Sequence, residues 1–135
     1  MIKRDLKNNL DTVQSLAPKA RTASENGAAV DLAGYGAAMV VFDFGLFTNG
    51  SFTPSVEESD SENSGFAAVS AGDLEGSLSV VDSNTEDNVH QRVGYKGNKR
   101  YIRAVLSEGS SPAPGTGCVA AASVVRGCPD VAPLA

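Results

Sequence analysis

Only a few residues in this sequence are of the types that usually carry out catalysis. His90 is the single histidine, so a metal site built from several histidines is excluded. A Ser-His-Asp triad would have to use His90, which lies in a predicted strand without the sharp turn that presents a nucleophilic serine. We therefore expect a protein that is not an enzyme and that holds no cofactor.

The acidic stretch at residues 82–88 (Asp-Ser-Asn-Thr-Glu-Asp-Asn) is the one segment that resembles a metal loop. It places oxygen-bearing side chains at alternate positions, as the start of a calcium loop does. It lacks the glycine that such a loop needs at its sixth position, and Val93 stands where the final glutamate would be. We interpret the stretch as a solvated turn and expect no bound metal.

Cys118 and Cys128 are the only cysteines, and their spacing is not that of a metal site. If the chain between them is extended, ten steps of roughly 3.3 Å place their Cα atoms about 33 Å apart. A disulfide needs Cα atoms within roughly 7 Å of each other. We predict two free thiols, as in a protein of a reducing compartment.

Charged residues fall into three blocks along the chain, which has a net charge of −5. Residues 1–21 carry five bases and two acids, residues 22–91 carry twelve acids and no Lys or Arg, and residues 92–135 carry six bases and two acids. Two interpretations remain open: simple solvation of the surface, or charge-complementary contact between copies or with a partner. The acidic middle block disfavours direct binding of nucleic acid, because it repels phosphates.

The basic residues of the outer blocks supply the predicted partner-binding set. Its members are Lys3, Arg4, Lys7, Arg21, Arg92, Lys99, Arg100 and Arg103. For the later group the alternative role is a solvated strand face with lysines that guard a sheet edge. We expect Arg103, which apolar residues flank, to be buried and paired, and a suitable acidic partner is the segment Glu57–Glu62 of a neighbouring copy.

Side chains alternate with period two through much of the chain, which predicts strands. The stretch Arg92–Leu106 is expected to form a central hairpin that turns at Gly97-Asn98. The most hydrophobic run, Ala37–Phe44, is expected to be a buried strand, with Met39–Phe44 and in particular Val41 in the core. The remaining predicted strands are Ala28–Leu32, Ser51–Ser59, Phe66–Val69, Leu78–Val81 and Cys118–Val125.

About eight short strands separated by turns predict an all-β fold, a single β-sandwich or jelly-roll-like domain over residues 25–130. Residues 1–24 lack strand periodicity and are expected to form an N-terminal arm that is extended, partly helical or ordered only on a partner; a frayed terminus is the alternative. Residues 131–135 are expected to be a tail. No apolar run approaches the roughly 20 residues of a membrane helix, and the polar start is unlike a secretory signal, so we expect a soluble cytoplasmic product.

In order and spacing, the predicted elements resemble those of the small auxiliary head proteins of tailed bacteriophages, the capsid cement or decoration proteins. The resemblance covers roughly residues 5–130 and rests on the whole set of segments, since no single one is a specific motif. The segments are Asp31-Leu32, Met39–Phe44, Phe52, Val56–Asp60, Phe66–Val69, Asp73-Leu74, Gly94-Tyr95, Lys99–Arg103 and Ser123–Gly127. The loop at residues 107–117 and both cysteines lie outside it.

This resemblance implies a non-catalytic, oligomeric protein that binds the outside of a capsid and stabilises it by bridging major capsid subunits. The implied partners are the major capsid protein and further copies in a dimer or trimer, without nucleic acid or membrane. The protein would be made in the host bacterial cytoplasm and end on the outer surface of the virion. Two alternatives stay open: a head–tail joining or tail structural protein, and a β-sandwich ligand-binding module on the virion surface. A carbohydrate module is disfavoured, because the chain has no Trp and only three Tyr for sugar stacking.

Overall fold

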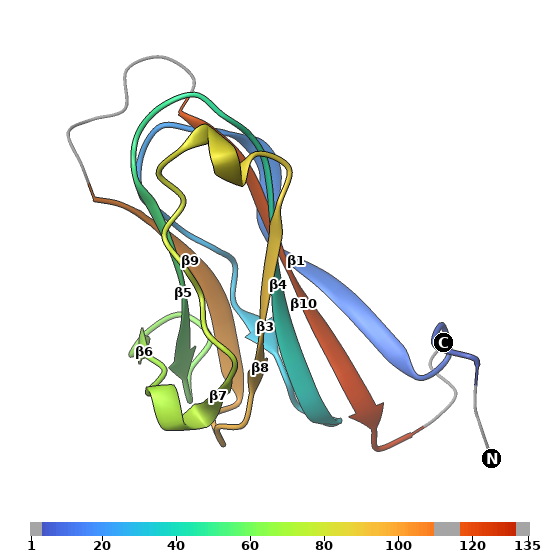
Figure 1. The fold of residues 1–135 in the computed structure, drawn as a ribbon. Helices are drawn as coiled ribbons and strands as arrows, with labels where there is room; N and C mark the ends of the chain where they lie inside the picture. The colour runs from blue at the N-terminus through green and yellow to red at the C-terminus, as the bar shows by residue number, and fades with distance from the viewer. Residues whose placement is uncertain (1–3, 110–116, 132–135) are drawn as a thin grey trace.

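The computed structural model describes residues 4–109 and 117–131 and shows an all-β protein in which two antiparallel sheets lie face to face (Figure 1). The first sheet has the order β1-β10-β4-β8-β7, and the second has the order β2-β9-β5-β6, with β3 also paired to β9. Two short 3-10 helices, η1 (Ala71–Asp73) and η2 (Asn84–Glu86), lie in the connections. The strands of the first sheet are β1 (Leu10–Arg21), β10 (Cys118–Pro129), β4 (Tyr35–Phe47), β8 (His90–Tyr95) and β7 (Leu74–Glu75). Those of the second are β2 (Glu25–Asn26), β3 (Val30–Asp31), β9 (Tyr101–Glu108), β5 (Phe52–Ser59) and β6 (Ala67–Ala68). The all-β sandwich expected from the sequence is therefore confirmed.

The core lies between the sheets and is filled by alternate residues of the long strands. In β4, Val40, Phe42 and Phe44 are buried, whereas Val41 is half-buried and Asp43 is exposed. The expected burial of this strand is confirmed for one face. The expectation that Val41 lies in the core is wrong, because only that face of β4 meets the second sheet and Val41 lies on the other. In β10 the inward positions include alanines, whose small side chains let the sheets approach closely.

The predicted hairpin at Arg92–Leu106 is also wrong. Strand β8 pairs with β4 and β7, whereas β9 pairs with β5, β2 and β3, so the two predicted hairpin strands belong to different sheets. Gly97 lies in the connection that crosses between the sheets. A Cβ atom there would come within 2.4 Å of the Tyr95 hydroxyl oxygen, so glycine is needed for this close approach rather than for a tight two-residue turn.

The N-terminal prediction needs the largest correction. Residues 10–21 of the expected arm form β1, which pairs antiparallel with β10 from Leu10 opposite Gly127 to Arg21 opposite Cys118. Leu16 is buried in the core. Register shifts interrupt β1 on both sides of Leu16, and they break the period-two pattern that would have predicted the strand. The sandwich therefore begins at Leu10 rather than at residue 25.

The remaining strand predictions succeed in part. The strand predicted at 51–59 is confirmed as β5. One side of β5 pairs with β9 along its length, whereas the other side pairs with β6 only at Glu57 and Glu58, so Pro54 lies at a sheet edge. Residues 78–81 contribute only an isolated bridge from Val81 to Phe52, so the strand predicted there is wrong. Strand β10 runs to Pro129, four residues beyond its predicted end. The predicted tail lies outside the described residues except for Val131.

Candidate interaction surface

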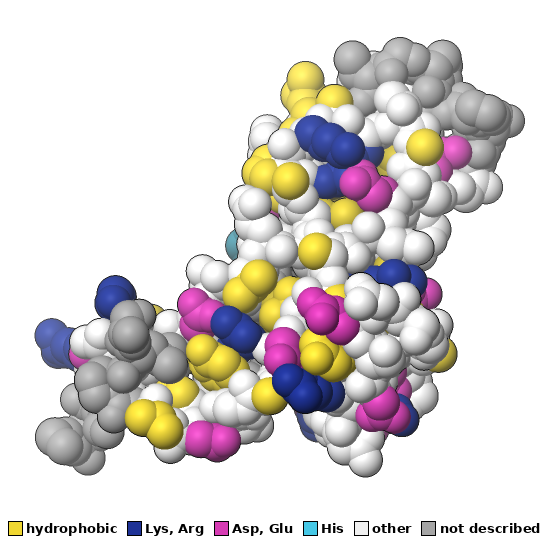
Figure 2. Space-filling model, turned by 180° about the vertical axis from the view of Figure 1, so that it is seen from behind, with side chains coloured by type: hydrophobic (Ala, Val, Ile, Leu, Met, Phe, Trp, Pro, Cys, Tyr) yellow, Lys and Arg dark blue, Asp and Glu magenta, His cyan; other side chains and the backbone are white. Residues whose placement is uncertain are grey.

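Four of the eight predicted partner-binding cations form ion pairs within the chain. They are Arg21 with Glu25, Lys99 with Asp60 at 2.7 Å, Arg100 with Asp31 at 2.8 Å, and Arg103 with Glu57 at 2.5 Å. On the face seen in Figure 2, Lys and Arg side chains accordingly lie beside Asp and Glu side chains in several places instead of forming one basic patch. The pairs of Lys99, Arg100 and Arg103 leave little unbalanced positive charge around the start of β9 that could bind an acidic partner.

Arg103 shows why the pairing is internal. The register of β5 and β9 places Glu57 opposite Arg103, and the guanidinium donates from Nε and Nη2 to Glu57 Oε1 at 2.8 and 2.5 Å. The same guanidinium lies 4.2 Å from the centre of the Phe66 ring. Only 21% of the Arg103 side chain is exposed. The expectation that Arg103 is paired is confirmed, and strand pairing within one chain supplies the acid that we had assigned to a neighbouring copy.

Arg100 makes a two-pronged contact with Asp31 at the end of β3. Its Nε and Nη2 atoms donate to the two carboxylate oxygens at 2.9 and 2.8 Å. The hydrogen bond from Arg100, together with one from the Ala33 N–H, lowers the pKa of Asp31 to about 2. Both side chains remain substantially exposed, so the pair orients the loop after β3 more than it stabilises the fold.

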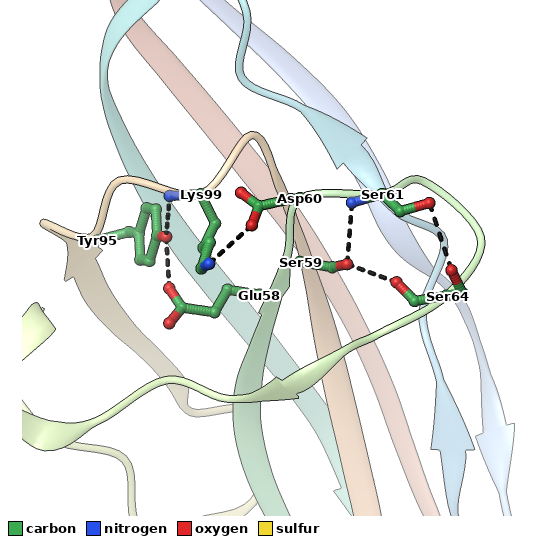
Figure 3. Close-up of polar contacts among 7 residues, drawn as sticks. All are labelled: Glu58, Ser59, Asp60, Ser61, Ser64, Tyr95 and Lys99. Carbon is green, nitrogen blue, oxygen red and sulfur yellow. Dashed lines mark hydrogen bonds and ion pairs between the residues drawn. The ribbon is translucent and has the colours of Figure 1, made fainter.

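Tyr95 holds the connection between the sheets at the point where β8 ends (Figure 3). Its hydroxyl donates to Glu58 Oε2 at 2.5 Å and accepts from the Lys99 N–H at 3.1 Å. Burial and the hydrogen bond to Glu58 both raise the pKa of Tyr95, so the phenol stays protonated and keeps its donor. The Lys99 ammonium then bonds to Asp60, which ties this connection to the acidic loop after β5.

The acidic loop itself is shaped by serines. The buried Ser59 hydroxyl donates to the Ser64 carbonyl oxygen at 2.5 Å and accepts from the Ser61 N–H at 3.0 Å (Figure 3). Of the acids in the loop, Asp60 is paired within the chain, whereas Glu62 is exposed and no described residue forms an ion pair with it. The loop therefore offers a neighbouring copy less free negative charge than its sequence implies.

A polar pocket of about 400 Å³ opens between the connection at 97–100 and residues 32–38, which comprise the β3–β4 connection and the start of β4. Tyr95, Lys99, Arg100 and Asp60 contribute to its lining, and Tyr35 with small residues of the second segment supply the rest. Tyr35 is held in place by Arg126, whose guanidinium lies 4.4 Å from its ring centre. No local pattern predicts this pocket, because it forms only where two segments far apart in the sequence meet.

Arg21 is the member of the predicted set that is least available to a partner. Its side chain is 1% exposed, and it donates to the carbonyl oxygens of Ala120 and Ala17 besides its contact with Glu25. It therefore ties β1 to β10 and β2 from inside the sandwich. The assignment of Arg21 to partner binding is wrong, because its guanidinium is buried.

Arg4, Lys7 and Arg92 are the described cations of the set that are exposed and form no ion pair with another described residue. Arg92 lies on the outer face of the first sheet. Arg4 and Lys7 lie just before β1, in a turn where the Asp5 carboxylate accepts from the backbone and side chain of Asn8. Lys3 lies outside the described residues. Two of these three free cations thus lie together at the start of the chain, and the third lies on the outer face of the first sheet.

Side chains that could hold a metal ion do not converge in the described ranges. No group of three or more His, Cys, Asp or Glu side chains in residues 4–109 and 117–131 is placed to hold a metal ion. In the stretch 82–88, Asp87 Oδ1 accepts from the Phe47 N–H and Glu86 Oε2 from the Asp82 N–H, so these oxygens shape the turn. His90 is exposed at the start of β8. Cys118 is buried, Cys128 is exposed, and both are free thiols, as predicted.

Two further results bear on the class of protein. Within the described part of the chain, no helix is long and apolar enough to span a membrane. Searches against protein-family models, curated proteins and solved structures found no match to the chain.

Proposed function

We propose that this chain is a structural virion protein that binds the outside of a phage capsid and stabilises it by bridging major capsid subunits. The order and spacing of its segments support this proposal, as does the two-sheet antiparallel architecture. Its partners are the major capsid protein and further copies of itself, in a dimer or trimer, without nucleic acid or membrane. It is made in the host bacterial cytoplasm, takes its place on the outer capsid surface, and performs no catalysis.

The observation that carries this proposal is where the free cations lie. Arg4 and Lys7 are exposed beside Leu6, whose side chain is 64% exposed. A short segment that combines positive charge with an exposed apolar side chain is suited to contact with a larger protein surface. Strand β1 anchors this segment to the sandwich directly, so binding at residues 1–9 would fix the position of the whole domain. The binding arm is therefore shorter than residues 1–24.

This anchoring changes the experiment that tests the arm. Deletion of residues 2–24 would remove β1 and with it the buried Leu16, so loss of binding could not be told from loss of folding. The better variant is the double substitution Arg4→Gln/Lys7→Gln, whose side chains make no ion pair with another described residue. Its control is Lys19→Gln/Lys96→Gln, which removes the same charge from two exposed lysines that pair with acids of their own chain.

The assay is binding of each protein to expanded capsids at two salt concentrations, with thermal unfolding as the check on folding. We expect the first variant to bind about tenfold more weakly and with less salt dependence, while the control binds like the unmodified protein. Equal binding by both variants would refute the role of the N-terminal segment. Failure of the unmodified protein to bind capsids would refute the capsid function itself.

The second candidate is a ligand-binding module on the virion surface, and the polar pocket between residues 32–38 and 97–100 favours it. The hydroxyl and charged groups of Tyr95, Lys99, Arg100 and Asp60 are suited to a small polar ligand. A panel of oligosaccharides screened by calorimetry tests this candidate. Binding that Tyr35→Ala abolishes would favour it, and no binding across the panel would contradict it. A third alternative, a head–tail joining or tail structural protein, is distinguished from a capsid protein by its position in the phage particle, at the head–tail junction or in the tail.

A further inference from the structure

The edges of the two sheets differ sharply in length. Strands β2, β3, β6 and β7, which border the sheets elsewhere, have two residues each, whereas β1 borders the first sheet with twelve. Short edge strands protect a sheet from pairing with other chains, and a long one exposes a row of unpaired backbone groups. Strand β1 is therefore the edge at which pairing with another chain needs to be considered.

The second half of β1 is closed to a further strand. At Ser15 the carbonyl oxygen accepts from the Ala28 N–H at 2.7 Å, and the hydroxyl donates to the Ala28 carbonyl oxygen and accepts from the Ala104 N–H. Beyond it, the register shifts again and Pro18 removes a backbone donor. These features join β1 to the second sheet and protect this half of the edge.

The first half, Leu10–Gln14, has none of these features. It pairs with β10 without a register shift, and it contains no proline or lysine. The Leu10 N–H donates to the Leu6 carbonyl oxygen at 2.8 Å, which places it on the side away from β10. Since alternate residues of a strand point their backbone groups the same way, the N–H and C=O groups of Thr12 and Gln14 also face that open side. No described residue bonds to them there.

The charge on this half is also compatible with pairing. Its single charged residue, Asp11, forms an ion pair with Arg126 of the adjacent strand. Arg126 in turn donates to the Asp31 carbonyl oxygen at 2.7 Å, so the carboxylate of Asp11 is held toward the interior of its own chain. A neighbouring strand would therefore meet exposed Thr12 and Gln14 rather than a free charge.

We infer that Leu10–Gln14 pairs with the same segment of a second copy, antiparallel and about a two-fold axis at Thr12. In this register Thr12 faces Thr12 of the second copy, each Leu10 faces Gln14, and each Asp11 faces Val13, so no like charges stand opposite each other. The two threonines exchange both of their backbone hydrogen bonds, and each Gln14 N–H donates to a Leu10 carbonyl oxygen. The first sheets of two copies thereby become one continuous sheet in a closed, two-fold dimer.

A second copy fits this edge better than an unrelated strand does, because the open segment is short and self-complementary. In the two-fold register the open N–H and C=O groups of each copy meet the complementary groups of the other, and no like charges stand opposite each other. The pairing also goes beyond the proposed function, since it needs no capsid and would occur in the purified protein. Its failure would leave the binding of single copies to a capsid untouched.

Sedimentation equilibrium of the purified chain over rising concentration tests the inference, with Thr12→Lys as the variant and Thr53→Lys as the control. Thr53 is an equally exposed threonine in β5 of the other sheet. We expect the unmodified chain and Thr53→Lys to dimerise alike and Thr12→Lys to dimerise at least about fivefold more weakly, because it sets two lysines opposite each other. A chain that stays monomeric, or a Thr12→Lys variant that dimerises as tightly, overturns the inference.

Hydrogen exchange on the unmodified chain gives a test that needs no variant. Dimerisation should slow exchange at the Thr12 and Gln14 amides as protein concentration rises. The Val13 amide, which points toward β10, should be protected at every concentration. Exchange at Thr12 and Gln14 that is independent of concentration while the chain is dimeric would place the interface elsewhere and contradict this pairing.

Discussion

Replacement of Phe42 by alanine tests the placement of β4 in the core. The Phe42 side chain is fully buried, and its ring centroid lies 6.3 Å from that of Phe44, with the ring planes 9° apart. Truncation of such a ring leaves a cavity and costs about 3–5 kcal/mol of the free energy of unfolding. With a urea m-value of about 2 kcal/mol per molar, the midpoint of unfolding should fall by about 2 M.

The matched variant is Val41→Asp, one residue earlier on the same strand. Val41 lies on the outer face, directly opposite Arg92 of β8, so the introduced carboxylate would face a cation in water. We expect a loss of about 1 kcal/mol or less, measured by the same urea titration. A one-residue shift of register would exchange the two faces of β4. If Val41→Asp unfolds the protein while Phe42→Ala is tolerated, the register described for β4 is refuted.

Three further results are expected. Gly117→Ala should lower the melting temperature strongly, because Gly117 has a φ of +61° and a Cβ atom there would lie 1.9 Å from the carbonyl oxygen of Arg21. The control Gly72→Ala, which has open space around it, should leave the melting temperature unchanged, and equal effects of the two variants would contradict this packing. The free energy of unfolding of the unmodified chain should exceed that of Asp31→Asn by its full amount above about pH 4, and the difference should vanish toward about pH 2. Between these pH values the unfolded state binds more protons than the folded state, because folding lowers the pKa of Asp31. A difference that is independent of pH would contradict the ion pair. A thiol reagent should modify Cys128 rapidly and Cys118 only on unfolding, because burial shields Cys118 and raises its pKa to about 11. Equal rates of modification in the native protein would refute the burial of Cys118.

The sequence predicts the fold class well because alternation and turn residues are local signals. The chain bends at Asn49-Gly50, with Gly50 at a φ of +100°, and the strands on either side, β4 and β5, are close to their predicted places. Alternation does not say which strand pairs with which. The runs on either side of Gly97 have strand character, yet β8 pairs with β4 and β9 pairs with β5, so they lie in different sheets. Such long-range pairing is not encoded in a local turn signal.

Strand β1 was missed for a different reason. Its register shifts around Leu16 interrupt the alternation, so the stretch has no clear period although it pairs with β10 over most of its length. The partner-binding set shows the same limit for charge. Composition identifies Arg100 and Arg103 as cations, but only the pairing of strands reveals that each already has an acid beside it. Charge that is free for a partner can be counted only after the sheets are known.

Cryo-electron microscopy of the parent phage particle tests the central claim most directly. We expect copies of this sandwich on the outer surface of the head, each in contact with more than one major capsid subunit, with the residues before β1 at the contact. Heads that lack the protein, or copies that occur only in the tail or at the head–tail junction, would contradict it.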